Sequence, residues 1–228
     1  MNSSKYNTFL TVLLIIIIVA IVGIIGFLGY KFISSENSKK EAENFVDSWN
    51  EDTNQGNKKD EGTISTDTKI DVDVTTPEQT ESTKTDSTQT KENTYYGFLM
   101  AGTIEIPKTN VKCPVLEGPA SNDKIEVAVA VQYPLNATLN TEGNVVIAGH
   151  NYRNGTFFSD NKKLGNGDKI YITDLNGSKV EYRVYNTFIT EANDNSIYNR
   201  DTDGKREITL YSCTDDLAGR LIVQARAD

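Results

Sequence analysis

The sequence predicts an all-β domain, an eight-stranded β-barrel with short helices, preceded by an N-terminal transmembrane helix and a disordered tether. Three observations lead to this fold class. Residues 9–30 carry no charge, residues 51–94 hold 12 threonines and no aromatic side chain, and residues 95–228 alternate short apolar runs with turn signals. Many short strands separated by turns are typical of barrels and sandwiches.

Residues 9–30 follow a short N-terminal segment, residues 1–8, and lie between Lys5 and Lys31. As a helix these 22 residues would extend about 33 Å, enough to cross the hydrocarbon core of a bilayer. A cleaved signal peptide is the alternative, but its apolar core would span about 7–15 residues and end at a small-residue cleavage site. The run is longer, and residues 29–32 form a poor cleavage site, so we expect an uncleaved, single-pass anchor.

Charge alone does not set the orientation of this anchor, because Lys5 precedes it and Lys31, Lys39 and Lys40 follow it. The whole chain has a net charge of −9, and the acidic excess lies mainly before residue 95. The sequence contains no basic cluster, which argues against a nucleic-acid partner.

Residues 31–50 form a juxtamembrane segment, and an amphipathic helix is predicted over 36–50. Apolar side chains recur at the i, i+3, i+4 and i+7 positions of that helix: Ala42, Phe45, Val46 and Trp49. We expect the helix to continue from the span or to rest on the bilayer, with Trp49 as an interfacial anchor. A partner-binding helix is the alternative.

Residues 51–94 are rich in threonine and charge and contain no aromatic residue. They cannot bury enough apolar surface to offset the entropy lost on ordering, so this linker is predicted to be disordered. As a flexible coil, 44 residues would span on the order of 35–40 Å. The linker would tether the membrane anchor to a folded domain.

The remaining 134 residues, 95–228, are enough for one domain with its own core. Asn176-Gly177 lies between two strand-like runs and is a strong hairpin signal. Short helices are expected near 95–101 and 156–164. The eight predicted strands are 102–107, 111–116, 126–132, 144–149, 168–173, 179–190, 206–213 and 220–226.

The two cysteines have different surroundings in the sequence. Cys113 lies within an apolar strand pattern, which predicts a small buried core residue. Cys213 ends a different strand, so a Cys113–Cys213 disulfide is the weaker alternative.

Three chemically active side chains fall at the ends of predicted strands. His150, the only histidine, follows the apolar run 145–148, Cys213 ends the strand 206–213, and Arg220 begins the last strand. If the last two strands pair antiparallel, Cys213 and Arg220 face each other at one rim. A thiol that attacks, an imidazole that moves protons and a guanidinium that holds developing negative charge are sufficient for acyl transfer through a thioester.

The motif Thr209-Leu210-Tyr211-Ser212-Cys213 resembles the Thr-Leu-x-Thr-Cys motif of sortases, the cysteine transpeptidases of Gram-positive cell surfaces. The order and spacing of the Ala-Gly-His run at 148–150 and of Arg220 also match this family. The runs at 102–107 and 114–118 are similar to its first strands, so the resemblance covers residues 95–228. The sequence departs from the family motif at Ser212, where threonine is usual, and serine keeps the hydroxyl.

This resemblance implies an eight-stranded sortase barrel that cleaves a Leu-Pro-x-Thr-Gly-like sorting signal after threonine. Cys213 would form the thioacyl intermediate, His150 would pass a proton to the leaving amine and take one from the incoming amine, and Arg220 would stabilise the oxyanion. The implied partners are surface proteins that bear the signal and a cell-wall amine, in the peptidoglycan stem or cross-bridge. The family needs no metal or organic cofactor. Wall substrates lie outside the cell, so we expect a catalytic domain on the extracellular side of the membrane.

Further residues are weaker candidates. Ser196, Thr209 and Ser212 are expected to touch substrate, and Asp215 could orient His150 as a third member of the set. A calcium site in the connection 191–205 is less favoured than a solvated loop, because the spacing of its acidic residues matches no strong calcium-binding pattern. These acidic residues are Glu191, Asp194, Asp201 and Asp203.

Two other functions stay open. A thiol peptidase on the same barrel would use water as the acceptor, and a non-catalytic surface-binding barrel would leave Cys213 idle. Within the sortase interpretation we expect a wall-anchoring enzyme of undefined subclass. The pilus-polymerising type is disfavoured, because it usually carries a span at the position after Asp228. The iron-uptake type is also disfavoured, because its connection between the strands ending at 190 and starting at 206 is usually longer.

Overall fold

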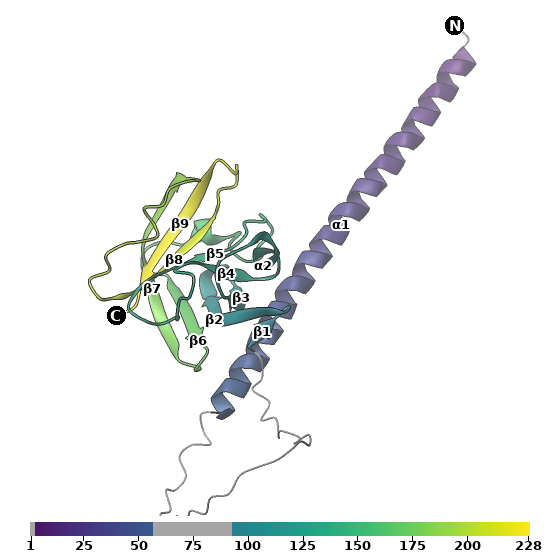
Figure 1. Ribbon diagram of the computed structural model, residues 1–228. Coiled ribbons are helices and arrows are strands. Elements are labelled where there is room, and N and C mark those ends of the chain that lie inside the picture. The colour runs from purple at the N-terminus through teal and green to yellow at the C-terminus, as the bar shows by residue number, and fades with distance from the viewer. Residues whose placement is uncertain (1–2, 57–92) are drawn as a thin grey trace, which may run out of the picture.

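The computed structural model describes residues 3–56 and 93–228, which form one long helix and a β-barrel (Figure 1). The helix, α1, runs over Ser3–Gly56. Most of the linker predicted to be disordered, residues 57–92 of 51–94, lies outside the described residues.

The barrel is a ring of eight strands in the order β2-β3-β4-β5-β8-β9-β7-β6, and β6 closes the ring by pairing with β2. A two-residue strand, β1, pairs only with β2. The predicted eight-stranded barrel is therefore confirmed. The strands are β1 (Thr94–Tyr95), β2 (Phe98–Ile106), β3 (Val111–Leu116), β4 (Val129–Tyr133), β5 (Gly143–Ala148), β6 (Lys169–Asp174), β7 (Lys179–Glu191), β8 (Arg206–Cys213) and β9 (Gly219–Arg226).

Helices in the barrel domain are short. They comprise α2 (Asn122–Val127) and the 3-10 helices η1 (Pro107–Thr109) and η2 (Asn161–Lys163). Ser121 caps α2, because its hydroxyl accepts a hydrogen bond from the Lys124 N–H at 3.4 Å. The sequence prediction of a strand over 126–132 was wrong at its start, since α2 occupies the first two of those positions and β4 begins at Val129.

Residues 95–101 form strands, and the short helix predicted there was wrong. Tyr96 and Gly97 both have positive φ, at 50° and 79°, and they form the two-residue turn between β1 and β2. Such a turn matches the twist of an antiparallel pair. The aromatic residues around it therefore continue as strand, which is the conformation they favour.

The hairpin predicted at Asn176-Gly177 joins β6 and β7. Gly177 adopts a φ of 79° and its N–H donates to the Asp174 carbonyl at 3.0 Å. Pairing then starts at Thr173 with Lys179. Glycine reaches this backbone region without steric cost, which explains why the turn signal located the hairpin correctly.

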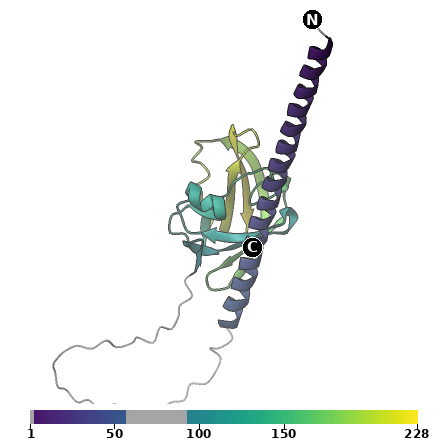
Figure 2. The ribbon, with the colours of Figure 1, turned by 90° about the vertical axis from the view of Figure 1, so that its right-hand side faces the viewer.

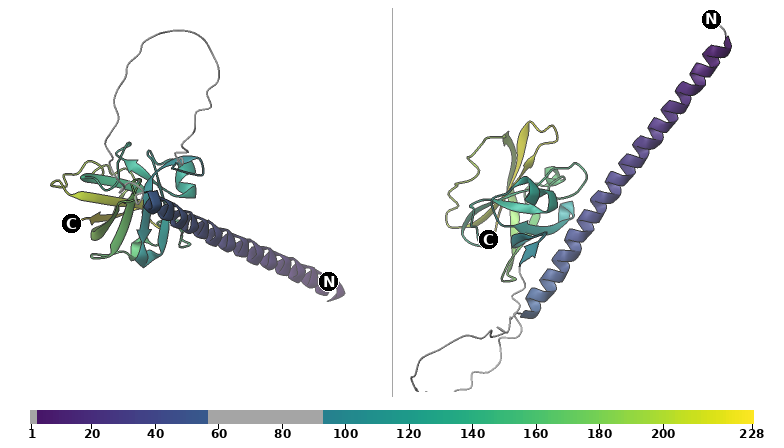
Figure 3. Two further views of the ribbon diagram at one scale, coloured as in Figure 1. Left: turned by 90° about the horizontal axis from the view of Figure 1, so that it is seen from below. Right: turned by 45° about the vertical axis from the view of Figure 1, so that its right-hand side comes forward.

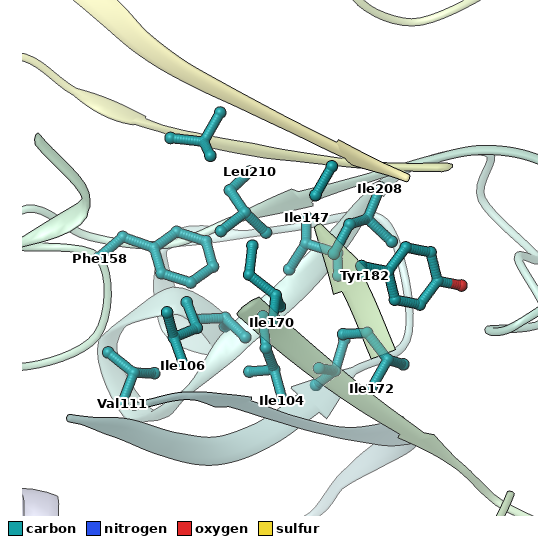
Figure 4. Close-up of a cluster of buried hydrophobic side chains, with 14 of the residues drawn as sticks. Ile104, Ile106, Val111, Ile147, Phe158, Ile170, Ile172, Tyr182, Ile208 and Leu210 are labelled. Carbon is teal, nitrogen blue, oxygen red and sulfur yellow. The ribbon is translucent and has the colours of Figure 1, made fainter. Parts of the chain in front are cut away.

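Inward-facing isoleucines and one tyrosine fill the barrel (Figure 4). Tyr182 is 1% exposed, and its hydroxyl donates to Asn140 at 3.2 Å, so the buried polar atom is paired. Cys113 lies in the same core, where burial raises the pKa of its thiol to about 12. Both cysteines are free thiols, so the alternative of a Cys113–Cys213 disulfide was wrong.

The C-terminal part of α1 packs against β1, β2 and β3, whereas its N-terminal part extends away from the barrel (Figures 1, 2 and 3). Trp49 is 4% exposed and its indole N–H donates to Asn93 at 3.3 Å. Phe45 contacts the Tyr95 ring at a centroid distance of 4.7 Å, and Asp47 pairs with Lys112. The predicted helix over 36–50 is confirmed, but its apolar face covers the barrel, so Trp49 is not the interfacial anchor that we expected.

No helix in the described part of the chain is long and apolar enough to cross a membrane. Several side chains of the expected anchor, residues 9–30, lie outside the described residues, and the anchor stays a prediction.

Candidate active site

The sheet order brings the strand that precedes His150 next to the strand that carries Cys213. β5 and β8 are neighbours and run parallel, with Ala148 opposite Tyr211. The Gly149 N–H continues this ladder by donating to the Tyr211 carbonyl at 3.1 Å. Parallel strands end at the same edge of a sheet, so the histidine and the cysteine leave the barrel at the same rim.

Cys213 and Arg220 are direct partners in the antiparallel pair β8–β9. Residues directly opposite each other in such a pair project from the same face of the sheet. Both are partly exposed, and Cys213 is a free thiol. The predicted hairpin between them is therefore confirmed, and a substrate held at this rim can contact the thiol and the guanidinium together.

The turn between these two strands is stabilised by its own hydrogen bonds. The Thr214 N–H donates to the Gly219 carbonyl at 3.1 Å, and the Gly219 N–H donates to the Thr214 hydroxyl at 3.0 Å. The Asp216 carboxylate accepts from the Thr214 hydroxyl at 2.5 Å and from the Ala218 N–H at 3.1 Å. These bonds hold the register that places Cys213 opposite Arg220.

The Arg220 guanidinium is held by two hydrogen bonds. Its Nε donates to the Tyr211 hydroxyl at 2.8 Å, and its Nη1 donates to the Gly219 carbonyl at 3.1 Å. Burial acts to lower the pKa of Arg220, but the Tyr211 hydrogen bond and the nearby Cys213 and Tyr198 raise it overall. The guanidinium therefore stays cationic beside the thiol, as oxyanion stabilisation requires.

His150 leaves β5 directly after a glycine that has no room for a side chain. A Cβ on Gly149 would lie 2.7 Å from the Phe158 ring and 2.9 Å from Val129. The His150 carbonyl accepts from the Phe158 N–H at 3.1 Å, and its ring lies 4.7 Å from the Tyr152 ring, centroid to centroid. The close packing at Gly149 fixes the backbone just before His150, and the Tyr152 ring lies beside the imidazole.

Two opposing effects set the pKa of His150. Burial lowers the pKa below its usual value near 6.5, and the carboxylate of Glu126, in α2, acts in the opposite direction with a smaller effect. The imidazole is therefore easier to deprotonate than a free histidine. This suits a group that must both give and accept a proton near neutral pH.

Asp215 does not bond to His150 in this arrangement. Its carboxylate accepts from Asn151 at 2.9 Å and from Lys162 at 2.6 Å, and these bonds lower its pKa. Its role as an orienter of His150 stays a prediction that this geometry does not favour. Asp215 instead ties the loop after Cys213 to the loop after His150.

The sequence analysis missed Asn151 and Tyr211. Asn151 follows His150 directly and donates to the Cys213 carbonyl at 3.0 Å, so it links the two loops. Tyr211 lies two residues before Cys213 in the same strand and therefore on the same face. Strand periodicity could have identified Tyr211, but no sequence signal indicated the partner of Asn151.

The three expected substrate contacts occupy different positions. Thr209 is fully buried and its hydroxyl donates to Asn144 at 2.8 Å, while Asn144 donates to the Ile197 carbonyl at 2.9 Å. Ser212 is 2% exposed, and Ser196 is exposed in the connection between β7 and β8. Thr209 thus supports that connection from beneath, and the substrate-contact role of all three stays a prediction.

The acidic residues considered for calcium make local turn contacts. Asp194 accepts from the Ser196 N–H at 2.8 Å and from the Thr190 hydroxyl, and Asp201 accepts from the Asp203 N–H at 2.9 Å. In residues 3–56 and 93–228, no three histidine, cysteine or acidic side chains gather in a way that could hold a metal ion.

A cavity of about 760 Å³ opens beside Cys213. The end of β7, the β8–β9 turn and the loop after His150 form its walls, and Ile189 in it is 68% exposed. The lining also includes three carboxylates and one ammonium group: Glu191, Asp215, Asp216 and Lys162. The cavity combines apolar and acidic lining residues and reaches Cys213, whereas His150 and Arg220 are not among its lining residues.

Known proteins resemble this barrel in sequence. Residues 104–228 match the Sortase domain family. Sortase A from Bacillus anthracis is 35% identical over 113 residues, which cover 49% of this chain and 51% of that protein. Sortase D from Bacillus subtilis (strain 168) is 27% identical over 140 residues, 60% of this chain and 67% of that protein. The chain thus spans about half the length of the first of these relatives.

Solved structures agree with these matches. Sortase A from Corynebacterium diphtheriae, as a lid mutant, superposes with a TM-score of 0.52 and 26% identity, covering 57% of this chain and 71% of that one. The Clostridium perfringens Sortase D5 transpeptidase gives a TM-score of 0.51 and 28% identity, over 57% of this chain and 79% of that one. Because the matched domain spans more than half of the sequence and includes His150, Cys213 and Arg220, the chain belongs to the sortase family.

Proposed function

We propose that this protein is a cysteine transpeptidase that cleaves a Leu-Pro-x-Thr-Gly-like sorting signal and transfers the new carboxyl end to an amine. The observation that carries the proposal is the direct pairing of Cys213 with Arg220 at the rim where His150 leaves β5. This arrangement supplies a nucleophile, a fixed cation and a proton carrier within a sortase domain.

In the first half of the reaction, the Cys213 thiolate attacks the carbonyl carbon of the threonine in the sorting signal. The carbonyl oxygen becomes negative in the tetrahedral intermediate, and the Arg220 guanidinium stabilises that charge. The C–N bond then breaks as the His150 imidazolium donates a proton to the departing amine. The products are a thioester on Cys213, a free amine and a neutral imidazole.

In the second half, an amine attacks the thioester carbonyl. His150 takes the proton that the amine loses as the new amide bond forms, and the Cys213 thiolate leaves. The enzyme returns to its starting charge state, so atoms and protons balance over the cycle. Arg220 again stabilises the oxyanion, because both halves pass through the same kind of tetrahedral intermediate.

The cavity beside Cys213 supports an amine as the acceptor. Glu191, Asp215 and Asp216 outnumber Lys162 among its charged walls, so its potential attracts an amine in its protonated form over an anion. The amine releases that proton to solvent before it attacks, and His150 takes the second proton as the amide bond forms. A surface protein with a sorting signal and a cell-wall amine, in a peptidoglycan stem or cross-bridge, are the partners that we propose on this basis. Water as the acceptor would make the same site a peptidase.

We also propose that residues 9–30 anchor the chain in the cell membrane with the barrel outside. The uncharged run of 22 residues supports the anchor, and the location of wall amines outside the cell supports the orientation. α1 continues from this run into the contact with the barrel, so the catalytic domain would stay close to the anchor.

The test uses the full chain in mild detergent with a panel of fluorogenic Leu-Pro-x-Thr-Gly-type peptides, with and without an amine acceptor. We expect cleavage, an amine-capped product and a thioacyl adduct on Cys213 by mass spectrometry. Cys213→Ala should abolish all three, whereas Cys113→Ala is the matched control, because the Cys113 thiol is buried in the core.

The other outcomes separate the alternatives. Cleavage that gives only the free acid, whatever amine is added, would identify a thiol peptidase. No cleavage across the panel, together with a Cys213 thiol that does not react with methanethiosulfonate, would contradict the proposal and favour a non-catalytic binding barrel.

A further inference from the structure

Tyr211 is hydrogen-bonded to two parts of the candidate active site and lies close in the chain to the third. It lies two residues before Cys213 in β8, its hydroxyl accepts from Arg220 Nε at 2.8 Å, and its carbonyl accepts from the Gly149 N–H at 3.1 Å. Gly149 directly precedes His150. The middle residue of the motif is thus bonded to the arginine and to the strand end that carries the histidine.

The position of Tyr211 in the sheet explains why its hydroxyl reaches Arg220. Tyr211 pairs with Ile222, and Cys213 pairs with Arg220, so Tyr211 and Arg220 are diagonal neighbours on one face. Diagonal neighbours have Cα atoms about 7–8 Å apart, which long side chains can bridge. The guanidinium carbon lies 5.6 Å from the centre of the Tyr211 ring, which adds a cation–π contact.

The Tyr211 ring is itself held in place. It packs against a cluster formed by Val146, Ile197 and Ile222, which are each at most 1% exposed. A ring buried on one side has few rotamers available, so its hydroxyl offers Arg220 a fixed acceptor. An arginine side chain loses much rotamer freedom on ordering, and a fixed acceptor offsets part of that cost.

The two hydrogen bonds leave one end of the guanidinium for a substrate. Nε is bonded to Tyr211 and Nη1 to the Gly219 carbonyl. In the part of the chain that the structure describes, Nη2 has no hydrogen-bond partner. The two N–H groups of Nη2 and the second N–H of Nη1 are therefore the donors that remain for an oxyanion formed at Cys213.

We propose that Tyr211 is a positioning residue that holds the Arg220 guanidinium in its oxyanion-binding orientation through the hydroxyl–Nε hydrogen bond. The inference rests on the proposed function, because it assigns Tyr211 a role in that reaction. Tyr211 itself touches neither the thiol nor the substrate in this role. Its contribution reaches the reaction through the arginine, so it should affect the transition state more than substrate binding.

The experiment compares the wild-type full chain with Tyr211→Phe in the cleavage assay described above. Tyr211→Phe keeps the ring and its packing and removes only the hydroxyl. We expect kcat/KM to fall about tenfold, nearly all of it in kcat with KM unchanged, which is the effect of losing one hydrogen bond to a charged group. Tyr171→Phe is the matched control, since the Tyr171 hydroxyl donates to Glu181 at 3.0 Å on β6, away from the rim.

A double-mutant cycle tests whether the hydroxyl acts through Nε. Lysine lacks a guanidinium and therefore lacks the Nε–H that bonds to Tyr211. In the Arg220→Lys background, Tyr211→Phe should therefore lower kcat/KM by less than about twofold. The Nε–H resonance of Arg220, identified by its loss in Arg220→Lys, should shift in Tyr211→Phe and stay in place in Tyr171→Phe.

Three results would overturn the inference while the proposed function stands: full activity in Tyr211→Phe, an unmoved Arg220 Nε–H resonance, or equal losses in the two backgrounds. A fall confined to KM would likewise contradict a positioning role and assign Tyr211 to substrate contact. A wild-type chain without Cys213-dependent cleavage would contradict the proposed function itself, and the inference would fall with it.

Discussion

Asn151 reaches across the rim of the barrel to Cys213, and its side-chain amide donates to the Cys213 carbonyl at 3.0 Å. The same amide donates to the Asp215 carboxylate at 2.9 Å. His150 follows the end of β5 and Cys213 ends β8, and this asparagine connects the loops beyond them. Their relative placement therefore depends on a residue outside the set that carries the chemistry.

Asn151→Ala should lower activity without unfolding the barrel. The change removes two hydrogen bonds at a partly exposed site, each worth about 1 kcal/mol. We expect kcat/KM to fall about 3–10-fold and the melting temperature to fall by only several degrees, with the barrel still folded. Asp160→Asn is a suitable control because it weakens an exposed ion pair with Lys163 at 2.9 Å outside the rim. Equal activity of Asn151→Ala and the wild type would contradict a role in aligning the two loops.

The pKa of His150 should be measurable directly, because the chain contains a single histidine. Burial lowers its pKa below about 6.5, and Glu126 partly opposes the shift. Glu126→Gln removes a negative charge that favours the imidazolium, so the pKa should fall further. Proton NMR titration of the imidazole in both chains measures the change, and Asp123→Asn in the same helix serves as the control. A rise of the pKa in Glu126→Gln would contradict this electrostatic assignment.

The same shift has a consequence for stability. The folded state releases the His150 proton more readily than the unfolded chain does, so between the lowered pKa and about 6.5 the unfolded state binds more protons. The contribution of His150 to the free energy of unfolding should therefore decrease as pH falls through this window. Urea unfolding of wild type and His150→Gln at several pH values checks the sign. A His150 contribution to the free energy of unfolding that increases as pH falls, relative to His150→Gln, would disprove this sign.

Trp49→Ala should destabilise the barrel, although Trp49 lies 44 residues before Asn93, its partner. The indole is 4% exposed and packs with Tyr95, Met100 and Leu116. Truncating a buried tryptophan costs about 3–5 kcal/mol. Thermal and urea unfolding measure the loss, and Ser48→Ala on the exposed side of the same helix should change stability by less than about 0.5 kcal/mol. Identical stability of Trp49→Ala and the wild type would mean that the helix does not pack on the barrel in solution.

Glu207→Gln should lower the free energy of unfolding more than Glu181→Gln does. Glu207 is 1% exposed and pairs with Arg200 and Arg226, whereas Glu181 pairs with Lys169 and Arg183 near the surface. Removing the buried carboxylate leaves two cations without their partner, at a cost of about 3–5 kcal/mol. Glu181→Gln should change stability little, because solvent screens its ion pairs. Equal losses in urea unfolding would show that burial does not govern these ion pairs.

Local patterns in the sequence were sufficient to locate the barrel strands and the hairpin that brings Cys213 opposite Arg220. Alternating β-branched residues located all eight barrel strands, and Asn176-Gly177 located the β6–β7 hairpin. The spacing of Cys213 and Arg220 required a short hairpin, which the structure contains. These features depend on contacts between residues close in the sequence, so they can be predicted from one amino-acid sequence.

Tertiary structure decided the contacts between residues far apart in the sequence. Whether the apolar stripe at Ala42 and Trp49 faces a membrane, a partner or the barrel depends on surfaces that lie beyond the linker, and the structure places it on the barrel. The bonds of Asn151 to Cys213 and of Thr209 to Asn144 likewise join separate strands.

Backbone preference and hydrophobic periodicity act over a few residues, so the sequence alone predicts most of the strands, the turn chemistry and the hairpin between Cys213 and Arg220. Three contacts are visible only in three dimensions: Arg220 bonds to Tyr211, Asp215 pairs with Asn151 and Lys162, and α1 covers part of the barrel. Those contacts depend on strand order and side-chain direction in the closed barrel, which arise when all strands pack together.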